Sequence, residues 1–285
     1  MPKVKFSNSR GIEQTTGGGV LLEELTMRRD GEAKLGHTGF ILGKNSAADA
    51  EADPYTQGTT QLWPLGTKMI YGDRVFVYAL MGGTVTAGKL VAQAVHQGAH
   101  HKDMDITTGD TPAIGAHRIS IETNGTNLTK DQYAGGYIYV NDGTGEGQLM
   151  KIKSHAAHVH GSDPTVVMTT FDPVTVALAD SGASKVTIHQ NKYYKVVVSP
   201  TSEASALAGV TVRDMTDENF GWLQVRGPSA LLTNGTIVVG QNVCRGQTTA
   251  GSVDAAPDDV TTVVGEVMVV NVTTDYSLID LKVGC

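Results

Sequence analysis

Residues 137–155 read YIYVNDGTGEGQLMKIKSH, in which two short apolar runs flank a connection rich in Gly, Asn and Asp. These three residue types tolerate the positive φ angles that tight hairpins require. The stretch therefore predicts two antiparallel strands joined by a turn.

The same succession of short strands and turn signals continues on both sides of this hairpin. Thr and Val each outnumber Leu, and β-branched residues favour half-buried pleated surfaces over long helices. Many short strands without alternating helical segments predict an all-β fold, built from antiparallel modules of the sandwich or barrel type. One short helix is expected near residues 202–209, SEASALAG. Further strands are expected at 118–122, 165–170, 185–189, 193–200, 221–227, 235–243, 261–272 and 277–283.

The first strand is expected in residues 68–80, where apolar side chains occupy both faces. Residues 89–95 are interpreted as its hairpin return, with a two-turn helix as the alternative. The stretches 74–95 and 221–243 resemble each other in their order of strand, Gly-containing connection and β-branched strand. This echo suggests two related β modules separated by the hairpin-rich region 117–200, with chance convergence of turn residues as an equal alternative. The expected domains are residues 67–160 and 161–285, or one continuous β body over both ranges.

Residues 1–66 show no sustained period of 2 or 3.6 and are interpreted as an extended N-terminal arm. A disordered tail is an equal alternative for the first 20 residues. The apolar segment LWPLG at 62–66 indicates that the later part of the arm docks on a surface. We expect Trp63 and Leu65 to be its anchors on another chain, because large exposed apolar side chains are otherwise a liability.

Composition and charge exclude several classes of protein. Lys and Arg number 22 and Asp and Glu 29, a formal charge of −7, so the chain lacks the basic field that nucleic acid binding requires. The N-terminus lacks the apolar core of a secretory signal. Apolar runs such as 267–270 are far shorter than the roughly 20 residues of a membrane span. We therefore expect a soluble protein with neither a nucleic acid nor a membrane as partner.

Histidines and cysteines were considered as ligands or reactive groups. In a strand His158 and His160 point to one side and His155 to the other, and a helix gathers only His155 and His158. Loop histidines are therefore favoured over a zinc site, and no metal or other cofactor is expected. Free thiols are favoured for Cys244 and Cys285, although a bridge between them is left open. A second histidine group consists of His96, His100 and His101.

No catalytic motif is present: the chain has no G-x-S-x-G elbow, no P-loop and no calcium loop. The Gly-rich and acidic segments are explained by turns and solvated loops. We therefore expect no enzymatic activity.

Four stretches together resemble virion structural proteins of tailed bacteriophages, most closely capsid decoration, or cement, proteins. These stretches are 135–155, 191–212, 220–240 and 263–283, which read GGYIYVNDGTGEGQLMKIKSH, NKYYKVVVSPTSEASALAGVTV, FGWLQVRGPSALLTNGTIVVG and VVGEVMVVNVTTDYSLIDLKV. The resemblance spans about residues 68–285. It implies a β-rich protein, often trimeric, on the outer surface of the virion head, where it ties subunits of the major capsid protein together.

Two alternatives remain open. A tail-associated or receptor-binding β protein shares this composition, but such a protein normally carries an exposed aromatic cluster for glycan stacking, and among 6% aromatic residues only Trp63 and Trp222 are available for that role. A β-rich metal-dependent hydrolase would require the histidines to converge.

Overall fold

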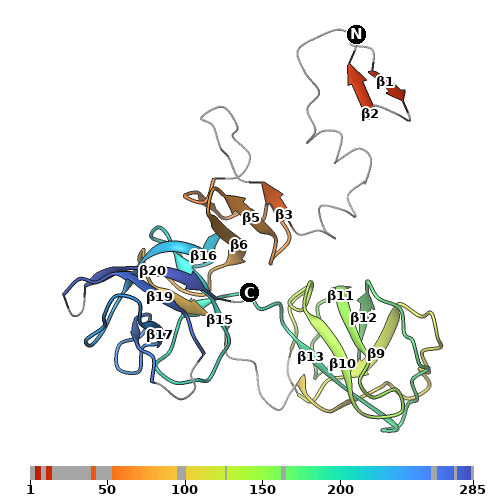
Figure 1. Ribbon diagram of the computed structural model, residues 1–285. Helices are drawn as coiled ribbons and strands as arrows, with labels where there is room; N and C mark the ends of the chain where they lie inside the picture. The colour runs from red at the N-terminus through yellow and green to blue at the C-terminus, as the bar shows by residue number, and fades with distance from the viewer. Residues whose placement is uncertain are drawn as a thin grey trace.

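A computed structural model describes residues 53–94, 101–125, 127–161, 165–257, 262–272 and 275–283. It also describes three strand backbones nearer the N-terminus: β1 (Val4–Ser7), β2 (Gly11–Gln14) and β3 (Phe40–Leu42). These residues include no α-helix, and the predicted all-β fold is confirmed as a half-barrel and a nearly closed barrel (Figure 1). Within the described ranges no helix has the length and hydropathy of a membrane span.

The nearly closed barrel is a sheet of six strands with the order β8-β13-β10-β11-β12-β9. The barrel closes where the N–H of Thr107, after β8, donates to the carbonyl of Ser120 in β9 at 3.0 Å. Side chains alternate inward and outward along each strand, as the strand period of two requires, and inward residues such as Ile138 and Met150 are fully buried. The strands are β8 (Met104–Asp105), β9 (Arg118–Glu122), β10 (Tyr137–Gly143), β11 (Leu149–His155), β12 (Thr165–Thr170) and β13 (Ser184–His189).

The half-barrel is the larger sheet, and its central element is β16 (Phe220–Leu232). The first half of β16 pairs with β6 and the second half with β20, both antiparallel. One strand thus joins the two sides of the sheet. The other strands are β3, which pairs parallel with β5, and β4 (Gln57–Gly58), β5 (Lys68–Tyr71), β6 (Arg74–Leu80), β7 (Leu90–Ala92), β14 (Val197–Val198), β15 (Leu207–Thr211), β17 (Asn242–Arg245), β18 (Val253–Ala255), β19 (Gly265–Val269) and β20 (Tyr276–Lys282).

A bulge in β16 marks the change of partner. The register of β16 against β6 shifts between Gln224 and Arg226. The buried Gln224 side chain spans the irregularity, because its Nε2 lies 3.1, 3.1 and 2.8 Å from the carbonyl oxygens of Arg226, Gly227 and Pro228. Gly227 has φ +82°, and a Cβ there would lie 2.5 Å from the carbonyl oxygen of Asp73. Glycine is therefore required at this close approach.

The barrel is an insertion within the half-barrel. The chain leaves the larger sheet after β7 and returns at β14, and these two strands pair through Ala92 and Val197. The structure thus differs from the predicted boundary at 160/161, since β11 and β12 lie on either side of it and pair with each other. The two echo strands, β6 and β16, also pair with each other in one sheet. They therefore do not begin two separate modules.

The strand pairing also disagrees with the predicted boundary between the arm, residues 1–66, and the first β domain. β4 lies within the predicted arm and pairs with β16 through Gly58 and Phe220. Residues 53–66 therefore pack on this chain's own sheet. The expectation for the rest of the arm falls mostly outside the described residues.

Several predicted strands differ in extent. Residues 68–80 form β5 and β6, separated by a turn at Gly72, which has φ +63°. Residues 89–95 contain a strand, β7, as predicted. The predicted strands at 193–200, 235–243 and 261–272 are each strands over only part of their length, as β14, β17 and β19. The expected helix at 202–209 is wrong, because Leu207–Thr211 pairs with β7 and β16 as β15.

Candidate functional site

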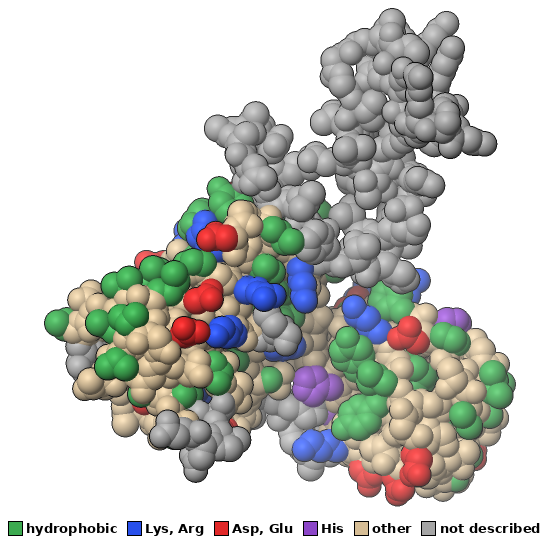
Figure 2. Space-filling view, viewed as in Figure 1, with side chains coloured by type: hydrophobic (Ala, Val, Ile, Leu, Met, Phe, Trp, Pro, Cys, Tyr) green, Lys and Arg blue, Asp and Glu red, His purple; other side chains and the backbone are tan. Residues whose placement is uncertain are grey.

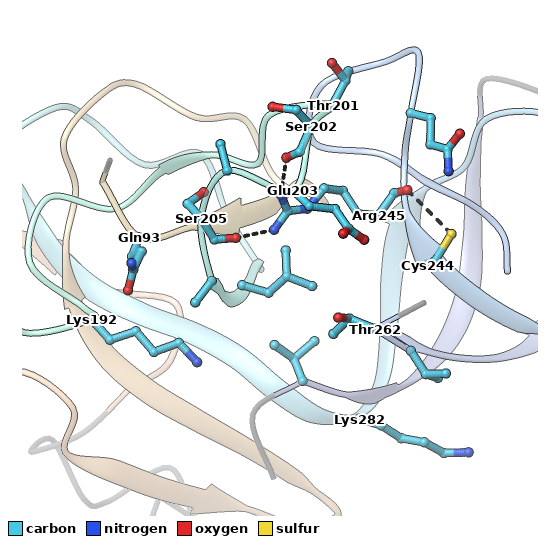
Figure 3. Close-up of a pocket in the computed structure, with 16 residues that line it drawn as sticks. Gln93, Lys192, Thr201, Ser202, Glu203, Ser205, Cys244, Arg245, Thr262 and Lys282 are labelled. Atoms are coloured by element: carbon cyan, nitrogen blue, oxygen red, sulfur yellow. Dashed lines mark hydrogen bonds between the residues drawn. The ribbon is translucent and has the colours of Figure 1, made fainter. Parts of the chain in front are cut away.

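A cleft of about 1040 Å³ lies in the half-barrel between the segment leading into β15 and the strands β17 and β20. Its basic side chains are Lys192, Arg245 and Lys282, and Glu203 is the only acidic one among the lining residues. Lys282 is paired with Glu266 at 3.1 Å. Figure 3 shows that Lys192 and Arg245 enter the cleft from different segments of the chain.

Arg245 has a structural partner on the wall of the cleft. Its guanidinium donates hydrogen bonds to the backbone carbonyls of Ser202 and Ser205, which fasten that loop to β17 (Figure 3). Burial lowers the pKa of Arg245 from its usual value, and the nearby charge of Glu203 acts in the opposite direction. Since the guanidinium is committed to the loop, we assign Arg245 to holding the wall in place.

Lys192 is the cleft cation least compensated by its surroundings. Burial, and then the positive charge of Lys68, lowers its pKa. Its ammonium nitrogen lies 5.5 Å from the centre of the Tyr193 ring. The cleft can therefore accept an anionic group beside Lys192, although its walls also include apolar residues such as Leu207 and Val263.

A second feature of the half-barrel is an exposed aliphatic surface, here called the valine surface. The turn at Val238 and Val239 is fastened to β19, because the N–H of Gly240 donates to the carbonyl of Val267 at 2.8 Å. Figure 2 shows hydrophobic side chains on the half-barrel in the region where Figure 1 places β19 and β20. The surface consists of Val238, Val239, Met268, Val269, Val270 and Val272, which are 40–68% exposed.

The outer wall of the barrel carries an exposed aromatic surface, here called the tyrosine face. Tyr137 and Tyr139 point outward from β10, while Ile138 between them is buried. Lys151 stands opposite Tyr137 on β11, and Leu149 stands opposite Tyr139. The face consists of Tyr137, Tyr139, Leu149, Lys151, Lys153 and Phe171.

The predicted partner anchors, Trp63 and Leu65, lie elsewhere. Both are partly buried and pack against a cluster in the half-barrel that includes Phe76, Tyr78 and Trp222. Their contacts in the structure are thus with their own chain, because the segment bearing them runs along the sheet. Their binding to another chain stays a prediction.

His155 ends β11, whereas His158 and His160 follow it outside the named strands, so the strand period does not decide how the three side chains lie. Thr123 Oγ1 lies 2.7 Å from His158 Nε2 and 3.1 Å from His160 Nδ1. The Nε2 atom of His155 accepts a hydrogen bond from the backbone N–H of Tyr133 at 3.0 Å. In the part of the chain that the structure describes, no three His, Cys, Asp or Glu side chains form a group that could hold a metal ion.

Of the second histidine group, His96 and His100 lie outside the described residues. The Nδ1 atom of His101 is hydrogen-bonded to the hydroxyl of Tyr133 in the barrel core. Cys244 is buried, with its Sγ 3.6 Å from the carbonyl oxygen of Arg245. Cys285 also lies outside the described residues, so the question of a bridge stays open.

Sequence reasoning missed both exposed surfaces. For the tyrosine face the signal was present, since the alternation in YIYVN places Tyr137 and Tyr139 on one side of a strand. The valine surface gave no such signal, because its residues occupy apolar runs that are typical of buried strands.

Comparisons of the chain with protein-family models, with curated proteins and with solved structures gave no match.

Proposed function

We propose that this protein is a capsid decoration protein that binds the outer surface of an assembled phage head and stabilises it without catalytic turnover. The observation that carries the proposal is the valine surface. Its members are all aliphatic, and five of the six are Val. Large exposed apolar patches on soluble proteins mark surfaces that bind other proteins.

The valine surface is held in place by hydrogen bonds within its own chain. The turn at Val238–Val239 is held to β19, and the N–H of Val238 also bonds to Gln241 Oε1 at 3.1 Å. A surface that is already ordered loses little conformational entropy on binding. Binding that occurs only on the assembled lattice stabilises the lattice by mass action, and many equivalent sites multiply the effect.

The proposal includes the major capsid protein as partner and a homotrimer as the bound state. Closed symmetric oligomers are common among soluble proteins, and a trimer would present three valine surfaces to the lattice at once. The resemblance to decoration proteins in residues 68–285 supports both.

The test is an electron-microscopic reconstruction of the parent virion, followed by rebinding to heads from which the protein has been removed. We expect density for this chain on the outside of the head, and we expect its removal to lower the temperature at which DNA escapes. The double variant Val239→Ser/Val272→Ser should reduce the number of bound copies at least tenfold. Ile114→Ser, at another exposed apolar position (71%), is the matched control and should bind normally.

Density restricted to the tail would overturn the proposal. Unchanged rebinding of the double variant would remove the role of the valine surface. The tail-associated or receptor-binding alternative is favoured by one observation, the aromatic character of the tyrosine face.

A further inference from the structure

The tyrosine face differs in chemistry from the valine surface. Three of its four apolar side chains are aromatic, with Tyr137, Tyr139 and Phe171 exposed by 41, 38 and 49%. The valine surface contains no aromatic member. Aromatic rings offer a flat apolar face with little conformational entropy to lose, and tyrosine adds a hydroxyl group.

Polar and apolar groups alternate across this face. One cross-strand row contains His189 of β13, Tyr137 of β10 and Lys151 of β11. Phe171 is next in this row, because its N–H donates to the Lys151 carbonyl at 2.8 Å. Neighbouring side chains in such a row are about 5 Å apart, and the next row lies about 7 Å along the strands. Along this row, an aromatic ring therefore alternates with a side chain that can form hydrogen bonds.

The face is preformed. Beneath it Ile138, Met150 and Ile152 are at most 1% exposed, which fixes the strands that carry the exposed rings. The carboxylate of Asp172 accepts a hydrogen bond from the N–H of Lys151 at 2.7 Å and so anchors the turn that bears Phe171. A ligand would consequently meet groups already in position.

The face is also cationic at one end, although the chain as a whole is acidic. The ammonium nitrogen of Lys153 lies 5.9 Å from the centre of the Phe171 ring, and Lys151 lies in the adjoining row. Neither lysine forms a salt bridge with another described residue. Two cations beside exposed rings complement a ligand that carries carboxylates.

We propose that the tyrosine face binds an acidic saccharide. A pyranose ring has an apolar C–H face that stacks on an aromatic ring, a rim of hydroxyl groups that bond to polar side chains, and in uronic acids a carboxylate that pairs with lysine. Tyr137 and Phe171 supply the rings, and Lys151 and Lys153 supply the charge. Figure 2 shows that hydrophobic side chains are grouped on the side of the barrel that faces the viewer. This inference does not depend on capsid binding.

The experiment is calorimetric titration of the purified full-length protein with an oligogalacturonate and, separately, with a neutral gluco-oligosaccharide of the same length. We expect saturable binding of the acidic oligomer and at least tenfold weaker binding of the neutral one. Tyr137→Ala and Phe171→Ala should each weaken binding at least tenfold, and Tyr137→Phe should retain most of it. Lys153→Ala should weaken only binding of the acidic oligomer. Val239→Ala, on the valine surface, is the matched control.

Three outcomes would overturn the inference. The first is absence of saturable binding by both oligomers, and the second is equal affinity for the two. The third is loss of head binding in Tyr137→Ala without any saccharide binding, which would assign the face to the capsid. The titration contains no heads, so its failure leaves the proposed decoration function unaffected.

Discussion

The side-chain amide of Asn191 donates a hydrogen bond to the backbone carbonyl of Leu65 at 3.2 Å, across 126 positions of sequence. The same Nδ2 lies 3.0 Å from the carbonyl oxygen of Gly135, just before β10 of the barrel, and Oδ1 accepts from the N–H of Tyr193. One buried side chain thus fastens the barrel to the half-barrel.

Replacement of Asn191 should therefore destabilise the protein. Asn191→Ala leaves the Leu65 and Gly135 carbonyls without this partner, which we expect to lower the free energy of unfolding by about 1–3 kcal/mol. Asn191→Asp keeps the acceptor but loses both donated bonds, so it should be at least as harmful. Urea denaturation measures both changes. Asn234→Ala, which loses an exposed bond to Thr248 and a long bond of 3.4 Å from Thr249, should cost less than Asn191→Ala; equal losses would contradict the role of Asn191.

Gly227 in the β16 bulge can be compared with Gly235. Both have positive φ, +82° and +74°, but a Cβ at Gly227 meets the Asp73 carbonyl, whereas at Gly235 it meets open space. Alanine at either position incurs backbone strain of about 1 kcal/mol. Gly227→Ala should cost at least about 1 kcal/mol more, because the neighbouring strand must also move. Thermal unfolding of the two variants tests this difference, and equal losses would show that the bulge accommodates a Cβ.

His155 should make stability depend on pH. Its Nδ1 donates to the carbonyl of Ala156 at 2.8 Å, and its Nε2 accepts from the N–H of Tyr133 at 3.0 Å, so the folded state holds the neutral ring. Burial, the largest cause, lowers its pKa below the usual 6.5. The unfolded chain then binds the proton more readily, and this contribution is complete above pH 6.5 and is lost as the pH falls toward the folded pKa.

The measurement is the urea midpoint between pH 7.5 and 5. The wild-type midpoint should fall as the pH decreases through this range, and His155→Gln should show a shallower slope. An unchanged slope in the variant would exclude His155 as the source.

The barrel should fold without the rest of the chain. Its core of sixteen buried residues, which includes Tyr133 and Ile188, is a separate cluster, and all six strands pair within residues 104–189. A fragment of residues 101–191 should give dispersed amide NMR signals and a cooperative thermal transition. A fragment with the narrow dispersion of an unfolded chain would show that the barrel requires the half-barrel.

Local patterns predicted most strands of the barrel, including 118–122 and 165–170, because each alternates side chains over a short run between turn residues. The pairing of β16 with both β6 and β20 could not be predicted, since it joins segments about 140 and 50 positions apart and depends on the Gln224 bulge. Leu207–Thr211 illustrates how tertiary contacts override local preference. Its Ala-rich lead-in favoured a helix, but its burial between β7 and β16 requires a strand.

The site could be predicted only in part. Strand alternation was expected to separate His155 from His158 and His160, but only His155 lies in a strand. It could not show that Thr123, more than thirty positions earlier, lies beside both His158 and His160. The runs at 238–239 and 267–272 have the composition of a core, and only the three-dimensional arrangement shows that their ends are exposed.

The pairing of β7 with β14 has a consequence for the gene as well as for the protein. Because Ala92 and Val197 are neighbours, the codons between them form a single in-frame cassette whose two ends meet in space. A related gene could lose this cassette, duplicate it or exchange it for another while every strand of the half-barrel kept its partners. The ligand preference of the barrel could then diversify independently of the valine surface on the half-barrel.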